Sequence, residues 1–142
     1  RARGFESFIR RFPNLTICMY DMPDNPKSTC KTLTERILKD NPDLLGIFVA
    51  NANTHYVAEF LENSARSGKV LLIGYDLVEK NRRYLERNII NYIISQQPEV
   101  QGYRGVYSLY RHLILKQPVK KNILMPIDIL TKENCAYYHP EV

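Results

Sequence analysis

The sequence predicts an α/β fold in three layers, in which helices cover both faces of a mainly parallel sheet. Short apolar runs without polar alternation are interspersed with amphipathic helical segments, a pattern typical of strands that are buried on both faces. The 142 residues are 44% hydrophobic and 25% charged, values that are typical of one globular domain. No internal repeat or low-complexity segment interrupts this alternation.

The first half of the chain contains two predicted strands. LTICMY is rich in strand-forming residues and follows an amino-terminal helix that Pro13 ends. The loop DMPDNPKS leads to a second helix, with Ser28 or Thr29 as N-cap and Asn41 at its end. LLGIFVAN is apolar almost throughout. The elements expected here are helices 4–12 and 28–41 and strands 15–20 and 44–51.

The second half repeats the alternation of helix and strand. A helix with an apolar inner side follows residue 53, and Gly68 is its expected C-cap. KVLLIGY, NIINYIIS and NILMPIDIL are strand patterns, and Pro98 opens a long helix in the first turn, where proline is favoured. The elements expected here are helices 54–67, 78–87 and 98–116 and strands 69–75, 88–95 and 122–130.

Charge and cysteine content argue against several classes of protein. The net charge of +5 comes from basic residues interspersed with acids, which favours solvated helix faces over a nucleic-acid surface. Cys18, Cys30 and Cys135 are odd in number and far apart, so they predict neither a disulfide framework nor a zinc site. Reduced thiols are typical of a cytoplasmic protein. No apolar run approaches the roughly 20 residues that cross a bilayer, and RARGFESFIRRF lacks the apolar core of a secretion signal.

Polar side chains follow three of the predicted strands. Asn51, Asp76 and Gln96 come at the carboxyl ends of strands, where open parallel sheets bind ligands. A carboxylate accepts hydrogen bonds from vicinal hydroxyls while amides both donate and accept, so this set suits a sugar. Each residue also has a structural interpretation. Asp76 could cap the following helix, Asn51 could form a turn and Gln96 could simply be exposed.

Signatures of enzymes and cofactors are weak. The sequence has no GxSxG elbow, no GxxxxGK[ST] loop and no GxGxxG after a strand. His55, His112 and His139 never show the HExxH spacing of a metal site, and His55 is expected at the start of a helix. Helical spacing of Tyr103 and Tyr107 favours packing over a stacking platform. We therefore expect no catalytic residue, metal or cofactor.

Several segments, taken in order, resemble the carboxyl-terminal half of LacI-type transcriptional regulators. These segments are RARGF, NPDLLGIFVANANT, VLLIGYD, IISQQPEVQGYRGV and PIDILTKEN. Such regulators are similar to the ribose-binding group of periplasmic binding proteins. The resemblance implies the Rossmann-like lobe of a type I periplasmic-binding-protein fold, with a sugar held between two lobes.

The resemblance also implies roles for individual residues. Asn51, Asp76 and Gln96 match family residues that contact the sugar. Met22 matches a position that is often aromatic and stacks on the ligand, so this chain departs from the pattern there. Arg1 matches an arginine that binds ligand just before the GF helix.

The resemblance further divides the chain into two parts. Residues 1–96 and about 123–142 would form the carboxyl-terminal lobe, whereas a helix over about 98–117 would pack with an amino-terminal lobe outside this chain. Without that lobe, we expect the apolar helix face to pack back on its own lobe or against another copy.

The implied function is the effector-binding and dimerisation portion of a cytoplasmic homodimeric regulator. It would bind a sugar or a sugar derivative and would contact operator DNA through a region that precedes residue 1. A periplasmic sugar-binding protein or sensor ectodomain is the alternative. A flavodoxin-like or sugar-modifying enzyme is a remoter one, because it would need a nucleophile paired with a base.

Overall fold

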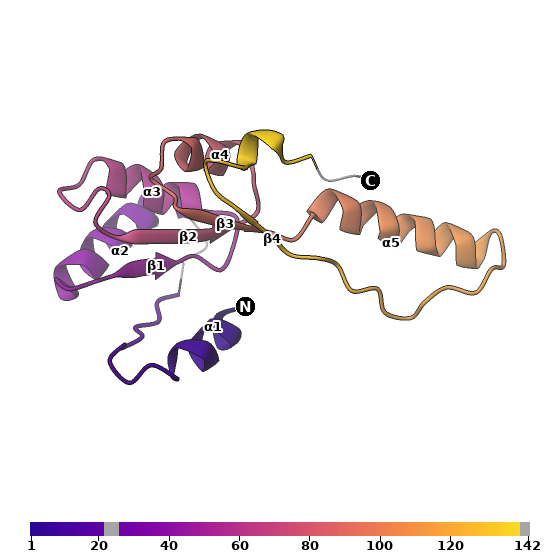
Figure 1. The fold of residues 1–142 in the computed structure, drawn as a ribbon, viewed down its shortest axis with the longest axis horizontal. Coiled ribbons are helices and arrows are strands. Elements are labelled where there is room, and N and C mark those ends of the chain that lie inside the picture. The colour runs from indigo at the N-terminus through magenta and orange to yellow at the C-terminus, as the bar shows by residue number, and fades with distance from the viewer. Residues whose placement is uncertain (22–25, 140–142) are drawn as a thin grey trace.

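A four-stranded, mainly parallel sheet lies at the centre of the fold (Figure 1). The structure is a computed structural model that describes residues 1–21 and 26–139, with the backbone alone for residues 26–28. β1 pairs in parallel with β2, and β2 with β3, whereas β4 runs antiparallel to β3. The predicted α/β class and mainly parallel sheet are confirmed. In spatial order the strands are β1 (Gly46–Phe48), β2 (Leu71–Tyr75), β3 (Tyr92–Ser95) and β4 (Asp128–Leu130).

Three helices form a row that builds the hydrophobic core with the sheet. α3 contacts α2, α4 and β2, so it lies at the middle of this row. Leu72 of β2, Leu85 of α4 and Ile93 of β3 are completely buried in the core. The helices are α1 (Ala2–Ile9), α2 (Pro26–Asp40), α3 (Thr54–Glu62), α4 (Glu79–Glu86) and α5 (Pro98–Leu113), and a 3₁₀ turn, η1, spans Cys135–Tyr137.

Glycine is required at position 74, where α3 begins against β2. A Cβ atom at Gly74 would lie 2.0 Å from the Thr54 Oγ1 atom, which is far inside van der Waals contact. Thr54 is the first residue of α3 and is completely buried. The missing side chain of Gly74 therefore sets the close approach of the helix to the strand and fixes the start of α3 at the carboxyl ends of the strands.

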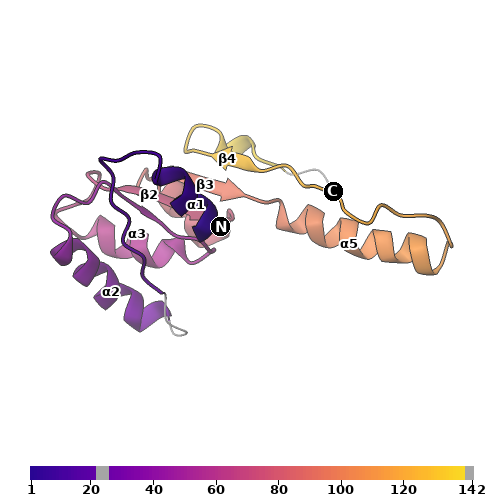
Figure 2. The same cartoon turned by 90° about the horizontal axis from the view of Figure 1, so that it is seen from below.

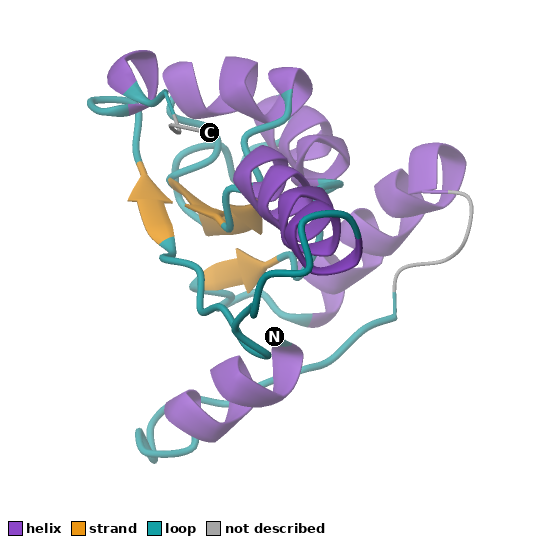
Figure 3. Cartoon of the chain, turned by 90° about the vertical axis from the view of Figure 1, so that its right-hand side faces the viewer, coloured by secondary structure: helices purple, strands orange, loops and turns teal. Residues whose placement is uncertain are grey.

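The amino-terminal helix lies beside the β1 end of the sheet, as Figures 1 and 3 show. Phe5 of α1 stacks on Phe48 of β1, with ring centroids 4.5 Å apart. Phe48 in turn meets the Tyr75 ring edge-on at 5.7 Å. These aromatic contacts attach α1 to the lobe and bring the start of the chain to the carboxyl end of β1.

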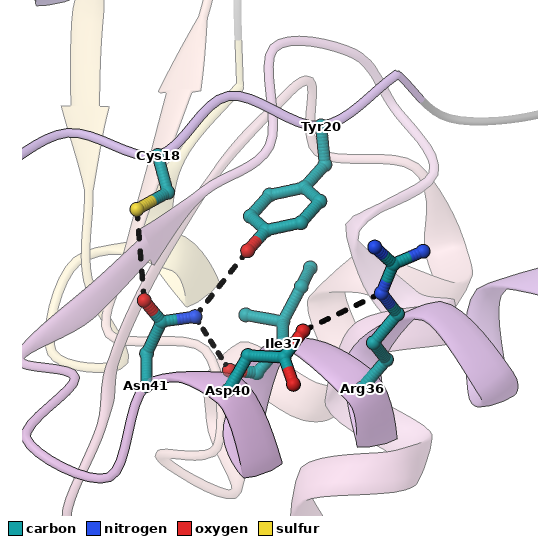
Figure 4. Close-up of polar contacts among 6 residues, drawn as sticks. All are labelled: Cys18, Tyr20, Arg36, Ile37, Asp40 and Asn41. Atoms are coloured by element: carbon teal, nitrogen blue, oxygen red, sulfur yellow. Dashed lines mark hydrogen bonds and ion pairs between the residues drawn. The ribbon is translucent and has the colours of Figure 1, made fainter.

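The predicted strand at residues 15–20 is wrong, because this segment is irregular and mostly exposed. A strand needs a hydrogen-bonded neighbour, and within the described residues β1 pairs with β2 alone. The segment is instead attached to the end of α2 through Asn41 (Figure 4). The Asn41 Nδ2 group donates to the Tyr20 hydroxyl at 3.3 Å, and the Cys18 thiol donates to Asn41 Oδ1 at 3.6 Å.

Residues 98–127 form an arm that projects from the lobe. α5 runs outward, and the irregular segment after it returns beside the helix to β4 (Figures 1 and 2). The expected packing of α5 back on its own lobe does not occur, because most of the helix is exposed. In this chain alone, Tyr103 and Tyr107 are about half exposed and stack on each other at 5.7 Å. Large exposed apolar side chains of the arm are Tyr103, Val106, Tyr107, Leu109, Tyr110, Leu113, Ile114, Leu115, Val119, Ile123, Leu124 and Ile127.

A polar network joins the two ends of the arm to the lobe. Gln97 precedes α5 with a left-handed backbone (φ 53°), and its Nε2 group donates to Asp128 Oδ2 of β4 at 2.8 Å. The Tyr138 hydroxyl lies 2.9 Å from the same carboxylate oxygen and 2.9 Å from the Ser95 hydroxyl. Burial raises the pKa of Tyr138.

Across the two described stretches, no helix is both long and apolar enough to span a bilayer.

Candidate ligand-binding site

Three of the predicted ligand-binding residues meet at the carboxyl ends of the parallel strands. Asp76 directly follows β2, Gln96 directly follows β3, and Arg1 precedes α1, which packs beside β1. The Gln96 Nε2 group donates to Asp76 Oδ1 at 3.3 Å. The Arg1 Nη2 group donates to Gln96 Oε1 at 2.8 Å. The side chains of Arg1, Asp76 and Gln96, which are three of the five predicted ligand-binding residues, therefore lie together in the structure.

Backbone and ring contacts hold the Arg1 guanidinium in place. Its Nη1 group donates to the Ala50 carbonyl oxygen at 3.1 Å, directly before Asn51 in the chain. Its Cζ atom lies 4.7 Å from the centroid of the Tyr75 ring, which is a cation–π distance. The guanidinium thus links the chain after β1 with the last residue of β2, and its remaining N–H groups are available to a ligand.

The amide of Gln96 separates two opposite charges. Among the described residues no ion pair joins Arg1 to Asp76, because Gln96 accepts from the guanidinium and donates to the carboxylate. The Gln96 Nε2 group lies 3.3 Å from Asp76 Oδ1 and 3.5 Å from Oδ2, and it does not saturate two carboxylate oxygens that together offer about four acceptor sites. The Asp76 carboxylate can therefore accept hydrogen bonds from the hydroxyl groups of a ligand.

The interpretation of Asp76 as a helix cap is not supported. The N-cap of α4 is Val78, and no side-chain hydrogen bond caps that helix. Asp76 instead adopts a left-handed backbone (φ 59°), which is uncommon for residues other than glycine. Its carboxylate is half-buried and points to Gln96 rather than to the amide groups of α4.

Asn51 has the structural role that the sequence left open. Its Oδ1 atom accepts a hydrogen bond from the Asn53 backbone N–H at 2.9 Å, which forms a turn before α3. In the described part of the chain its Nδ2 group has no protein hydrogen bond, and no hydrogen bond joins Asn51 to the Arg1, Gln96 or Asp76 side chain. Asn51 therefore forms a turn, and the donor of its side chain has no partner among the described residues. Met22 lies outside the described residues.

His55 is buried next to the site. It occupies the first turn of α3, as the sequence indicates, but only 9% of it is exposed. Its Nδ1 atom lies 3.3 Å from Asn81 Oδ1, and its Nε2 atom is buried without a partner among the described residues. Burial lowers the pKa of His55, so the ring is held in its neutral form. The described residues contain no group of three or more His, Cys, Asp or Glu that could hold a metal ion.

Comparison with known proteins shows the family of this chain. A family model described as a periplasmic binding protein domain matches residues 1–117. The chain belongs to the periplasmic binding protein family. The candidate site residues Arg1, Asp76 and Gln96 lie inside the range matched to this periplasmic binding protein domain.

Curated relatives of the domain are distant in sequence. It is 21% identical over 137 residues to the D-apiose import binding protein of Paraburkholderia graminis. It is 22% identical over 107 residues to the D-allose-binding periplasmic protein of Escherichia coli. These matches cover 96% and 75% of this chain, but 44% and 34% of the relatives. The domain thus spans less than half the length of these relatives.

Solved structures agree closely with the fold. A protein from Bacteroides fragilis, described as a candidate LacI transcriptional regulator, is 30% identical with a TM-score of 0.84, over 97% of this chain and 47% of that one. A periplasmic solute-binding protein of an ABC transporter from Actinobacillus succinogenes, solved with D-allose, is 25% identical with a TM-score of 0.86. That match covers 97% of this chain and 48% of that one.

The sequence did not predict the role of Asn81, a buried residue that connects the loops after β1 and β2 in this periplasmic binding protein domain. Asn81 lies within EKNRRYLER, which indicates a solvated helix face because most of its residues are charged. In the structure Asn81 is completely buried and contacts the loops after β1 and β2. An uncharged residue that interrupts a charged run at the start of a helix is the one signal that points to it.

Proposed function

We propose that this chain forms one half of a binding domain for a monosaccharide. The cluster of Arg1, Gln96 and Asp76 carries the proposal, because it places a guanidinium, an amide and a carboxylate in one connected set. Sugar hydroxyls donate to the carboxylate and accept from the guanidinium, while the amide orients both groups. The two curated relatives reported above are named for binding D-apiose and D-allose, which supports a sugar as the ligand.

The second half of the domain would close the site. The chain spans about half the length of its solved relatives, and the cluster faces outward from the carboxyl ends of the strands. We propose that an amino-terminal lobe covers both the sugar and the apolar face of α5. In this arrangement the lobe formed by residues 1–96 and about 123–142 supplies one wall of the cleft, and the helix over about 98–117 packs with the other lobe.

Two kinds of whole protein fit this half-domain. The curated relatives favour a sugar-binding protein of a transport or sensor system outside the cytoplasm. The Bacteroides fragilis structure, with 30% identity, favours the effector-binding part of a LacI-type regulator. Such a regulator would be a cytoplasmic homodimer that binds operator DNA through a region before residue 1. Neither candidate requires catalysis, since closure around the sugar produces the signal in both.

Binding of genomic DNA fragments by the complete protein separates the two candidates. A regulator should select a two-fold symmetric sequence, and its affinity for that sequence should change when the sugar binds. A transport protein should select no DNA sequence and should carry a secretion signal before residue 1. Sequence-selective DNA binding would overturn the transport interpretation, and its absence would overturn the regulator interpretation.

A thermal-shift and calorimetry panel tests the sugar site itself. D-allose, D-apiose and D-arabinose are the first probes, applied to the complete protein. The sugar that binds most tightly should lose about tenfold or more in affinity on Asp76→Ala, because hydrogen bonds to a charged group are lost. Asp43→Ala, at an exposed position before β1, is the control and should bind as the unchanged protein does. Equal affinity of Asp76→Ala and the unchanged protein would show that the site lies elsewhere.

A further inference from the structure

Asn81 is a buried side chain whose amide is fully engaged with the backbone. It lies in the first turn of α4 and has 0% exposure. Its Nδ2 group lies 3.0 Å from the Ala52 carbonyl oxygen, 3.2 Å from that of Tyr75 and 2.9 Å from that of Asp76. Its Oδ1 atom accepts from the His55 backbone N–H at 2.9 Å. One side chain therefore connects the loop after β1, the start of α3 and the turn after β2.

The chemistry of this contact set requires an uncharged amide. The Nδ2 group faces three carbonyl oxygens, of which that of Asp76 also accepts from the Val78 N–H. The His55 N–H needs an acceptor on the opposite atom of the same group. An aspartate would place a charged oxygen against the carbonyls, and an alanine would leave buried polar groups without partners. Asparagine supplies two N–H donors and a separate carbonyl acceptor without a charge, whereas the hydroxyl of serine or threonine supplies a single donor.

The contact with Asp76 bears directly on the ligand-facing carboxylate. Asp76 holds a left-handed backbone, which costs free energy in any residue with a Cβ atom. The Asn81 amide binds the carbonyl group of Asp76 itself and that of Tyr75 before it, so it constrains the peptides on both sides of the Asp76 Cα atom. The direction of the carboxylate follows from the backbone dihedral angles that these contacts maintain.

We propose that Asn81 is a positioning residue that fixes the turn of Asp76 for ligand binding. This inference rests on the proposed sugar site, and it adds a residue that does not itself touch the ligand. Asn81 fixes the orientation of the Asp76 carboxylate relative to Gln96, and it holds the loop after β1 at a fixed distance from the turn after β2. The site is thereby formed before the sugar arrives, which lowers the ordering cost of binding.

Two substitutions of Asn81 and one matched control test this inference in the complete protein. Asn81→Ala removes all the side-chain contacts, and Asn81→Asp keeps the volume and supplies a second variant if the first does not fold. The control is Asn91→Ala, because Asn91 Oδ1 accepts from the Leu72 backbone N–H at 2.8 Å near the opposite end of β2. All proteins are compared at a temperature at which each is folded. The readouts are calorimetric affinity for D-allose, D-apiose and D-arabinose and amide hydrogen exchange.

The exchange readout needs no ligand. The Val78 N–H donates to the Asp76 carbonyl oxygen at 2.9 Å, so its exchange rate reports the integrity of the turn. Both Asn81 variants should exchange about tenfold or more faster at Val78 and bind the tightest sugar about tenfold or more weakly. Asn91→Ala should keep both values within about twofold, although it lowers the free energy of unfolding.

The outcomes separate this inference from the proposed function. Unchanged exchange at Val78, or unchanged sugar affinity, in Asn81→Asp would overturn the positioning role. An equal loss of affinity in Asn91→Ala would also overturn it, because general destabilisation would then be the cause. If no sugar binds the unchanged protein, or if Asp76→Ala binds normally, the proposed function fails. In that case the exchange rate at Val78 alone decides whether Asn81 holds the turn.

Discussion

Gln96 sits between a positive and a negative side chain, and its neutral amide keeps them apart. The Arg1 guanidinium and the Asp76 carboxylate each bind one end of this amide, at 2.8 Å and 3.3 Å. A direct ion pair would occupy the acceptor sites of Asp76 that a sugar needs. At the scale of single residues, the identity of the side chain at position 96 therefore decides whether Asp76 remains available.

We expect Gln96→Glu to weaken sugar binding by about tenfold or more, because the new carboxylate pairs with Arg1 and repels Asp76. Titration calorimetry of the complete protein with its tightest sugar measures the change. Gln117→Glu is the matched control, since Gln117 Oε1 also accepts from an arginine, Arg111 Nε, at 2.9 Å on the exposed arm. Equal affinity of Gln96→Glu and Gln117→Glu would contradict this role of the amide.

His55 makes the stability of the lobe dependent on pH. Burial is the main cause of its lowered pKa, while Lys80 lowers the pKa further and the Asn81 hydrogen bond and Glu59 raise it. An unfolded chain has the ordinary histidine pKa of 6.5. Between the lowered folded value and 6.5 the unfolded chain binds more protons, so the free energy of unfolding falls as the pH falls through this window. Above 6.5 neither state binds the proton, and His55 adds no pH dependence.

Urea unfolding between about pH 8 and about pH 5 measures this effect. We expect His55→Gln to flatten the loss of stability below about pH 6.5. His112→Gln, at an exposed position on α5, should keep the slope of the unchanged protein. A His55→Gln slope equal to that of the His112→Gln control would show that another group causes the pH dependence.

The positions of the candidate site residues Asp76 and Gln96 were predictable, whereas the residue that supports them was not. Asp76 and Gln96 each follow an apolar strand directly, and parallel strands present their carboxyl ends at one place. Asn81 has no such signal, because its role depends on two loops that are distant in sequence. Arg1 could be placed only through the family resemblance, since nothing in its local sequence shows that it reaches Gln96.

At the scale of elements, hydrogen-bonded partners decided which predicted strands formed. Residues 69–75 and 88–95 were predicted as strands and contain β2 and β3, which pair with each other. Residues 15–20 have the same strand propensity but no neighbouring strand in the described structure, and Tyr20 and Cys18 contact Asn41 of the α2 end instead. Residues 122–130 form a strand only from Asp128, where pairing with β3 begins. Propensity is local, whereas pairing depends on the whole sheet.

The arm is attached to the lobe through Tyr138, whose hydroxyl forms hydrogen bonds with side chains of β3 and β4. The Tyr138 hydroxyl lies 2.9 Å from both Asp128 Oδ2 and Ser95 Oγ, next to the points where the arm leaves β3 and returns to β4. We expect Tyr138→Phe to lower the free energy of unfolding by about 0.5–1.5 kcal/mol, because it removes the hydrogen bonds of the hydroxyl to Ser95 and Asp128, which then keep only their contacts with Gln97. It should also speed amide exchange at Gln97.

The neighbouring tyrosine supplies the control for this measurement. Tyr137 is 83% exposed, so Tyr137→Phe should change the free energy of unfolding by less than about 0.5 kcal/mol. Chemical denaturation gives the free energies, and hydrogen exchange gives the local rates. If Tyr138→Phe and Tyr137→Phe are equally stable, the hydroxyl network does not hold the arm.

At the scale of the whole molecule, the lobe leaves most of the apolar surface of the arm uncovered. Val100 at its base is buried, whereas Val106, Leu109 and Leu113 further along α5 are between 55% and 71% exposed. These three residues follow helical spacing and share one face, together with the stacked rings of Tyr103 and Tyr107. Soluble monomers rarely expose a continuous apolar surface of this kind. We therefore expect a further surface to cover it in the complete protein.

Residues 1–142 alone should therefore self-associate through the arm. Burial of the α5 face between two copies removes apolar surface from water, which favours a dimer whose population rises with protein concentration. Leu109→Lys should weaken this association by about tenfold or more, because it places a charge in the contact. Leu45→Lys is the matched control, since Leu45 is 66% exposed and Leu109 is 60% exposed, but Leu45 lies before β1 and away from the arm. Sedimentation at several concentrations measures both variants, and a monomer at every concentration would show that the α5 face is stable in water.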